Sequence, residues 1–235
     1  MSKISPGSDL DKRPFGGGKS NPSLIAVERP ANVEVLDQLP LPNSDVGTFG
    51  TILADPPWRF QNRTGKVAPE HRRLSRYETL TVDEICSLPV GDLANGRGHL
   101  YLWVPNALLA DGLRVMEAWG FKYKSNLVWH KVRKDGGSDG RGVGFYFRNV
   151  TELVLFGVRG NMRTLRPGRS QVNLLASRKR EHSRKPDELY DIVESCSEGP
   201  YLELFARYPR PGWHVWGHEA DPSVEPRGKQ YPAYR

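Results

Sequence analysis

A series of short apolar runs, each the length of one strand, constrains the fold of this chain more than any other feature. The runs cover residues 49–54, 99–104, 126–132, 152–158, 201–205 and 214–216. Unbroken apolar runs are typical of strands that are buried on both faces in a parallel sheet. Segments of helical character lie between them, at residues 81–88, 108–119 and 187–196. The sequence therefore predicts an α/β domain built around a mostly parallel sheet.

The ends of the domain and of its first helix have their own signals. Thr81, followed three residues later by Glu84, predicts a capping box at the start of that helix. Residues 1–46 are rich in Pro, Gly, Ser and Asn with scattered apolar side chains, so we expect a disordered N-terminal arm. The folded domain is expected to span residues 47–220, followed by a C-terminal tail at residues 221–235.

Composition disfavours several classes of protein. No stretch approaches the roughly 20 apolar residues that cross a bilayer. The N-terminus lacks an apolar signal core, so we expect a cytoplasmic protein without a membrane partner. Cys86 and Cys196 are far apart and lack CxxC spacing, which argues against a disulfide framework and a structural metal site. The net charge of +7 favours a polyanionic partner, although a solvated basic surface explains it equally well.

The sequence Asp55-Pro56-Pro57-Trp58 directly follows the first apolar run. Ligands of open α/β sheets bind at the carboxyl ends of the strands, and the motif is expected at such an end. Two consecutive prolines have restricted φ angles and no N–H groups, so they can hold the carbonyls of this turn outward at little entropic cost. The alternative is a plain strand-ending turn whose tryptophan packs in the core.

Seven further blocks follow this one in a fixed order. The blocks are ILADPPW (52–58), RYETLTVDEI (76–85), HLYLWV (99–104), AWGF (118–121), LVWHK (127–131), RNVTELVLFGVRG (148–160), HSRKPDELYDIVE (182–194) and YLELFARYPRPGWHVWG (201–217). Over residues 47–219 the chain resembles the DPPW-type adenine-N(6) methyltransferases. That superfamily includes the catalytic subunit of the eukaryotic messenger-RNA adenosine methylase, and its bacterial and phage members look most similar to this chain.

The resemblance implies a Rossmann-like, S-adenosylmethionine-dependent methyltransferase in which the catalytic strand precedes the cofactor strand. It also implies methyl transfer to the exocyclic N(6) amine of adenine. The Asp55 carboxylate and the Pro56 carbonyl would accept hydrogen bonds from that amine and stabilise the positive charge that develops on its nitrogen. Pro57 would complete the rigid turn. Trp58 would offer a flat face on which the base stacks, worth ~1–3 kcal/mol.

The resemblance also assigns a set of cofactor contacts, namely Asp55, Lys185, Glu203, Arg207, His218 and Glu219. Lys185 precedes the last helix, where side chain and helix dipole both favour a carboxylate. Without the resemblance, a solvated lysine is the simpler interpretation. Glu203 and Arg207 bracket the end of a strand and could instead form a structural salt bridge. His218 replaces a commoner Asn, and residues 208–211 replace a polar pair that usually contacts ribose, so those contacts stay open.

Basic residues gather in three predicted loops, each after a strand end expected to face the active site. They are Arg63, Lys66, His71, Arg72, Arg73 and Arg76; then Lys131, Arg133, Lys134, Arg141 and Arg148; then Arg159, Arg163, Arg166, Arg169, Arg178, Lys179, Arg180 and Arg184. Such loops can track phosphates, and we expect about half of these residues to do so. The substrate contacts are predicted to be Trp58, Tyr77, Arg72, Arg73, Arg148 and Glu152, of which Tyr77 and Glu152 are implied by the resemblance. Tyr77 could equally be a core residue.

Three functional hypotheses follow. The first is an adenine-N(6) methyltransferase that acts on DNA, which would associate it with the nucleoid. The second is the same reaction on RNA. The third is an inactive homologue that only binds nucleic acid; the intact Asp55-Pro56-Pro57-Trp58 motif and Lys185 argue against it. We expect no separate target-recognition domain, so the choice of target sequence would come from these loops, from the N-terminal arm or from a partner. A homodimer or a homologous partner subunit is an open possibility.

Overall fold

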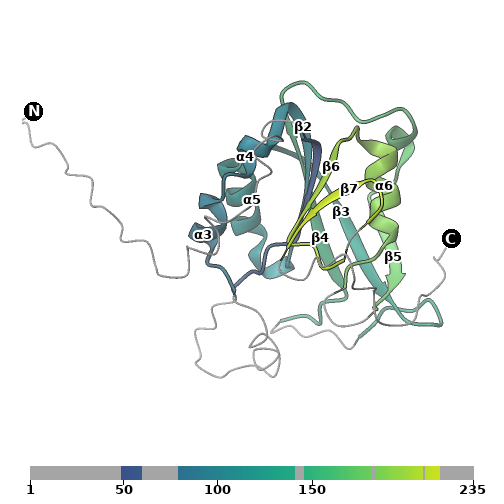
Figure 1. The fold of residues 1–235 in the computed structure, drawn as a ribbon. Coiled ribbons are helices and arrows are strands. Elements are labelled where there is room, and N and C mark those ends of the chain that lie inside the picture. The colour runs from purple at the N-terminus through teal and green to yellow at the C-terminus, as the bar shows by residue number, and fades with distance from the viewer. Residues whose placement is uncertain (1–48, 60–78, 141–145, 181–183, 209, 218–235) are drawn as a thin grey trace, which may run out of the picture. The chain divides into compact units, whose positions relative to one another are not determined.

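The computed structural model describes residues 49–59, 79–140, 146–180, 184–208 and 210–217. These residues form a seven-stranded sheet flanked by helices (Figure 1). In chain order the strands are β1 (Phe49–Ala54), β2 (Ala94–Val104), β3 (Lys122–Val132), β4 (Thr151–Arg159), β5 (Leu174–Arg178), β6 (Tyr201–Leu204) and β7 (Trp213–Trp216). The helices are α3 (Val82–Ser87), α4 (Val90–Leu93), α5 (Leu109–Ala118) and α6 (Glu188–Cys196), with short 3₁₀ turns η2 (Asn106–Leu108) and η3 (Pro167–Ser170).

The strands are ordered β5-β3-β4-β2-β1-β6-β7 across the sheet. Neighbouring strands are parallel except in the two pairs that include β4. β1 lies between β2 and β6, so the strand that precedes the Asp-Pro-Pro-Trp turn is beside the strand that carries Glu203. The predicted α/β fold with a mostly parallel sheet is confirmed, and the strand before the Asp-Pro-Pro-Trp turn precedes the Glu203 strand in the chain, as the resemblance implies.

Helices cover both faces of the sheet, with α6 on one side and α3, α4 and α5 on the other (Figure 1). Leu189 and Val193 of α6 belong to a buried cluster that also contains Trp103 of β2. On the opposite face, α5 approaches the sheet so closely that a Cβ on Gly112 would come within 2.6 Å of Val104. Burial of each large apolar side chain in these layers contributes about 1.5–3 kcal/mol.

The predicted elements are confirmed, although β2 begins five residues and β3 four residues earlier than predicted. At the start of α3 the Thr81 hydroxyl accepts a hydrogen bond from the Glu84 N–H at 3.2 Å, and the Glu84 carboxylate accepts one from the Thr81 N–H at 2.6 Å. The predicted capping box is therefore present. The N-terminal arm and the C-terminal tail lie outside the described residues. Within the described part of the chain, no helix has the length and apolar character that crossing a membrane requires.

One α-helix and one strand were not predicted, and both have weak sequence signals. Helix α4 has four residues, which is too short for an apolar periodicity to show. Strand β5 lies at the edge of the sheet, where buried and partly exposed residues alternate, and it contains Ser177 and Arg178. We predicted that segment as a basic loop because it lacks an unbroken apolar run.

The parallel strands all end at one edge of the sheet, and the antiparallel strand β4 begins there. Val104, the last residue of β2, pairs with Leu153 near the start of β4. Because β4 runs the opposite way, its first residues come to the same edge as Asp55, which follows the end of β1. The carboxyl edge therefore collects side chains from segments that are far apart in the sequence.

Candidate active site

Four charged side chains form a continuous series of ion pairs at the carboxyl edge. The Lys185 ammonium lies 2.9 Å from the Asp55 carboxylate and 3.5 Å from that of Glu152. The Lys131 ammonium lies 2.5 Å from the other Glu152 oxygen. The side chains of Asp55, Glu152 and Lys185 are 31%, 27% and 24% exposed, whereas that of Lys131 is 10% exposed. The series thus opens to solvent at its Asp55 end.

A different element positions each member of this series. Asp55 directly follows β1, and its N–H donates to the Leu204 carbonyl of β6 at 3.4 Å. Glu152 is the second residue of β4, and Lys131 lies near the end of β3. Lys185 lies in the segment that precedes α6. Pairing of strands in the sheet and docking of α6 are therefore both needed to assemble the series.

The charges in the series shift each other's ionisation. Burial alone would lower the pKa of Lys185, but Asp55 and Glu152 more than offset burial and hold that pKa above its ordinary value. Burial alone would raise the pKa of Glu152, but Lys185 and Lys131 hold it below its ordinary value. Burial raises the pKa of Asp55, and the Lys185 ammonium opposes that rise. Lys185 therefore stays charged at neutral pH and favours the ionised form of Asp55.

Two tryptophans lie beneath the lysines. The Lys185 nitrogen is 5.1 Å from the ring centroid of Trp103, and the Lys131 nitrogen is 4.9 Å from that of Trp129. The two rings meet edge to face, with their centroids 5.9 Å apart. The aromatic faces attract the ammonium groups and restrict where they can lie. The two tryptophan rings therefore help to position both lysines relative to the carboxylates.

Hydrogen bonds hold the turn after Asp55 in place. The Pro56 carbonyl accepts from the Trp58 N–H at 2.8 Å, and the Pro57 carbonyl accepts from the Leu80 N–H at 2.9 Å. The Trp58 indole N–H donates to the Trp103 carbonyl at 3.0 Å, and Trp58 is only 5% exposed. Pro56 keeps one lone pair for a further donor. Stacking of a base on Trp58 stays a prediction, and it requires this ring to become uncovered.

Glu203 of β6 is a further carboxylate at this edge. Its two oxygens accept from the Tyr190 hydroxyl of α6 at 2.9 and 2.8 Å. Burial raises the pKa of Glu203 to about 7, and the Tyr190 hydrogen bond opposes the rise. The Asp55 charge contributes to the same rise, and the Arg207 charge lowers the pKa of Asp55. The charges of Asp55, Glu203 and Arg207 are therefore close enough to affect the pKa values in this group.

Comparison with known proteins agrees with this geometry. The sequence profile of the MT-A70 family matches residues 49–219. The chain belongs to the MT-A70 family. The match spans every described element, from the β1 strand to the β7 strand. The resemblance predicted from the separate sequence blocks is thereby confirmed.

Several MT-A70 relatives have names that state an activity. The chain is 32% identical to the human N(6)-adenosine-methyltransferase catalytic subunit METTL3 over 200 residues, which are 80% of this chain and 32% of METTL3. A putative Medicago truncatula N(6)-adenosine-methyltransferase MT-A70-like protein is 33% identical over 74% of this chain and 27% of its own length. The chain thus spans about a quarter to a third of these relatives. The Mycoplasma type II methyltransferase M.MunI is 30% identical over 79% of this chain and 82% of its own length.

The MT-A70 fold gathers some predicted site residues and leaves others outside the described chain. Asp55, Lys185 and Glu152 contact one another, and Glu203 and Arg207 lie in the same neighbourhood. Arg148 is exposed three residues before β4, on the same edge of the sheet. The remaining predicted contacts lie outside the described residues: Tyr77, Arg72, Arg73, His218 and Glu219.

The predicted placement of the basic residues is wrong in two respects. Lys131, Arg180 and Arg184 are buried in ion pairs with Glu152, Glu188 and Asp187 respectively, so they do not present charge to a phosphate. The residues from Arg159 to Arg169 lie at the amino edge of the sheet, away from the candidate site. The reason is that β4 is antiparallel, so the segment after it emerges at the edge where its neighbours begin.

The sequence did not predict the roles that Lys131, Trp103 and Tyr190 have in this site. Lys131 was predicted as a phosphate contact, but it is the second cation on Glu152. Its spacing of two residues from Trp129, on the same face of β3, was the available signal. The interaction of Trp103 with Lys185 and that of Tyr190 with Glu203 have no local sequence signal, since each joins elements that are distant in the chain.

Proposed function

We propose that this MT-A70 domain transfers a methyl group from S-adenosylmethionine to the N(6) amine of adenine in a nucleic acid. The observation that carries the proposal is the Asp55 carboxylate, which is held 2.9 Å from Lys185 and partly exposed at the carboxyl edge, next to the Pro56 carbonyl. The fold and the names of the relatives support the same reaction.

The chain's own contribution is to bind the amine and to stabilise charge. The lone pair of an adenine amine is delocalised into the ring, and its nitrogen becomes positive during attack. The Asp55 carboxylate and the remaining lone pair of Pro56 can accept the amine hydrogens and stabilise that positive charge. Fixed geometry matters most in such a transfer, and the hydrogen-bonded proline turn provides it. S-adenosylmethionine supplies, when bound, a methyl group on a positively charged sulfur, which is the leaving group when an amine attacks the methyl carbon.

The charges at the carboxyl edge suit S-adenosylmethionine. The cofactor has a carboxylate, an ammonium group and ribose hydroxyls, and it needs partners of both signs. Lys185 and Arg207 are candidate partners for the carboxylate. Asp55 and Glu203 are candidate acceptors for the ammonium group and the hydroxyls. Each of these four residues is partly exposed, so each can be reached by a ligand.

We favour DNA over RNA as the substrate. The chain covers 82% of the type II methyltransferase M.MunI but only a quarter to a third of the adenosine methyltransferases. The similarity therefore extends over most of M.MunI, and a DNA substrate would place the protein at the nucleoid within the cytoplasm. The inactive-homologue hypothesis is disfavoured, because a binding scaffold does not need a partly exposed carboxylate paired with a lysine at this edge.

Transfer of tritium from labelled cofactor to duplex DNA, single-stranded DNA and RNA tests the proposal. We expect incorporation that is recovered as N(6)-methyladenine, with duplex DNA as the best substrate. Asp55→Ala should lower kcat by about 10²-fold or more. Asp92→Asn, an exposed carboxylate on α4, is the matched control and should retain activity. No incorporation into any of the three substrates, or full activity of Asp55→Ala, would contradict the proposed reaction.

A further inference from the structure

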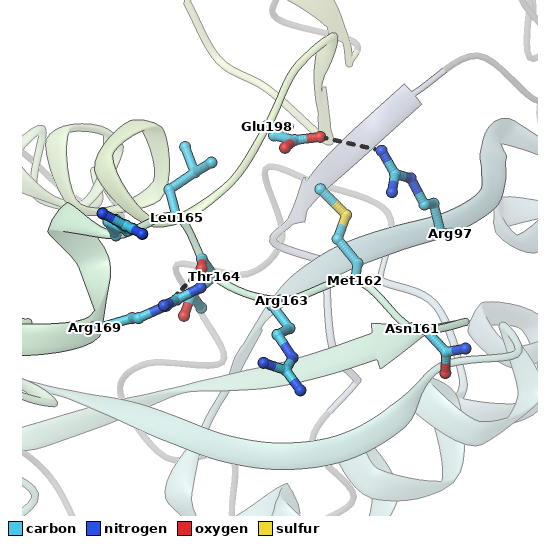
Figure 2. Close-up of a pocket in the computed structure, with 9 residues that line it drawn as sticks. Arg97, Asn161, Met162, Arg163, Thr164, Leu165, Arg169 and Glu198 are labelled. Atoms are coloured by element: carbon cyan, nitrogen blue, oxygen red, sulfur yellow. Dashed lines mark hydrogen bonds and ion pairs between the residues drawn. The ribbon is translucent and has the colours of Figure 1, made fainter.

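A basic pocket lies at the amino edge of the sheet, apart from the candidate active site. It is a pocket of about 350 Å³ between the start of β2, the segment that follows β4, and the turn before β6. Figure 2 shows its lining, which includes Arg97, Arg163, Arg169 and Glu198. The function proposed above makes no use of this pocket.

Strand register fixes how far the pocket is from the candidate active site. Arg97 lies at the start of β2, where the neighbouring Gly98 pairs with Arg159 at the end of β4. Ala54, which precedes Asp55, pairs with Leu102. At about 3.3 Å per residue along β2, Arg97 and the level of Asp55 are about 20 Å apart. The pocket therefore cannot contact a base that is held at Asp55, but it can contact a long ligand at a second point.

The charge of the pocket is strongly one-sided. Arg97, Arg163, Arg166 and Arg169 line it together with one acidic residue, Glu198. Arg97 and Glu198 are 3.5 Å apart, but their side chains are 66% and 52% exposed, so this pair is weak. Among the residues that the structure describes, neither Arg163 nor Arg166 forms an ion pair, and both are exposed. At least two guanidinium groups are therefore available to an anion.

The backbone that carries these arginines is anchored to the core. The Leu165 N–H donates to the Cys196 carbonyl of α6 at 2.8 Å. Gly168 lies against Cys196 so closely that a Cβ would come within 2.6 Å of its Cα. Met162, in the same segment, is only 8% exposed and lines the pocket. The loop is thus held in one position, which lowers the entropic cost of binding a ligand.

We propose that this pocket binds backbone phosphates of the nucleic acid whose adenine is methylated at the opposite edge. Guanidinium groups match phosphate oxygens in both charge and hydrogen-bond geometry, and phosphate contacts position a nucleic acid without reading its sequence. The inference rests on the proposed function for the identity of the polyanion. A second contact about 20 Å from the target base would hold the substrate in register.

The salt dependence of nucleic-acid binding tests this pocket without relying on catalysis. Binding of a fluorescent 20-base-pair duplex to the full chain is measured from 50 to 300 mM salt without cofactor. Each lost phosphate contact should reduce the slope of log K against log salt by about 0.9. The Arg163→Gln/Arg166→Gln variant should therefore lose about 1.8 from that slope and bind more weakly. Arg114→Gln, which removes an exposed arginine on α5, is the control and should change the slope much less.

Two further arms separate the possible failures. Inorganic phosphate is titrated into wild type and the double variant; loss of phosphate binding with an unchanged duplex slope would show that the pocket serves a small phosphate ligand and would overturn the proposal. An unchanged slope with unchanged phosphate binding would overturn it as well. If the wild type methylates no substrate but the double variant still loses slope, the pocket proposal stands and the proposed reaction fails.

Discussion

Replacing Lys185 with methionine tests whether this lysine keeps Asp55 in its ionised form. The two charged groups are 2.9 Å apart. At an effective dielectric constant of about 20, unit charges at that distance attract each other by about 6 kcal/mol. The side chains are 24% and 31% exposed, so solvent screening leaves about 1–3 kcal/mol. Since 1.36 kcal/mol corresponds to a tenfold change in an equilibrium constant, loss of this attraction should raise the pKa of Asp55 further above its ordinary value.

The assay is the pH dependence of kcat with saturating cofactor. A carboxyl group with a raised folded pKa is ionised only at higher pH, so the acid limb of the Lys185→Met profile should move upward by about one to two pH units, with recovery of activity toward alkaline pH. Lys185→Arg keeps the charge and should keep the limb near its wild-type position. Lys131→Met removes the cation that touches Glu152 but not Asp55, and it should shift the limb less. A uniform loss of activity in Lys185→Met, with the limb unmoved, would refute the reasoning.

Three other predictions concern cofactor binding and stability. Because burial raises the pKa of Glu203 to about 7, this carboxyl takes up a proton as pH falls through 7, and the affinity for S-adenosylmethionine measured by calorimetry should fall over the same range. The Glu203→Gln variant should bind the cofactor with little pH dependence. A pH profile identical to that of the wild type would remove Glu203 from the cofactor site. Gly112→Ala places a methyl group 2.6 Å from Val104 and should lower the free energy of unfolding by about 1–3 kcal/mol in urea, whereas Gly96→Ala, in open space, should leave it within about 0.5 kcal/mol. Burial lowers the pKa of His99 below its ordinary 6.5, so the unfolded chain binds the extra proton first. The free energy of unfolding should therefore decrease as pH falls below about 6.5, by up to about 1.4 kcal/mol per pH unit. For His99→Gln this decrease should be smaller, and equal pH slopes in variant and wild type would contradict this assignment.

The sequence was sufficient to predict the main elements of the fold, because their signals are local. Six of the seven described strands follow from apolar runs, and the start of α3 follows from the Thr81 and Glu84 capping pair. Strand β5 could not be predicted, since an edge strand buries only part of its surface and has a mixed sequence. The position of Asp55 after the end of β1 was also predictable, because the motif directly follows an apolar run.

What only the tertiary structure decided is which distant side chains meet and at which edge of the sheet. A local pattern cannot reveal that Lys185 lies between Asp55 and Glu152, because their contact depends on strand pairing and on the docking of α6. Nor can it reveal the direction of β4. An antiparallel β4 brings Glu152 to the active-site edge and sends Arg163 and Arg166 to the other, because a strand that runs the opposite way begins where its neighbours end. The sequence thus identifies the charged residues, whereas the direction of β4 decides which of them lie at the active-site edge and which lie at the opposite edge.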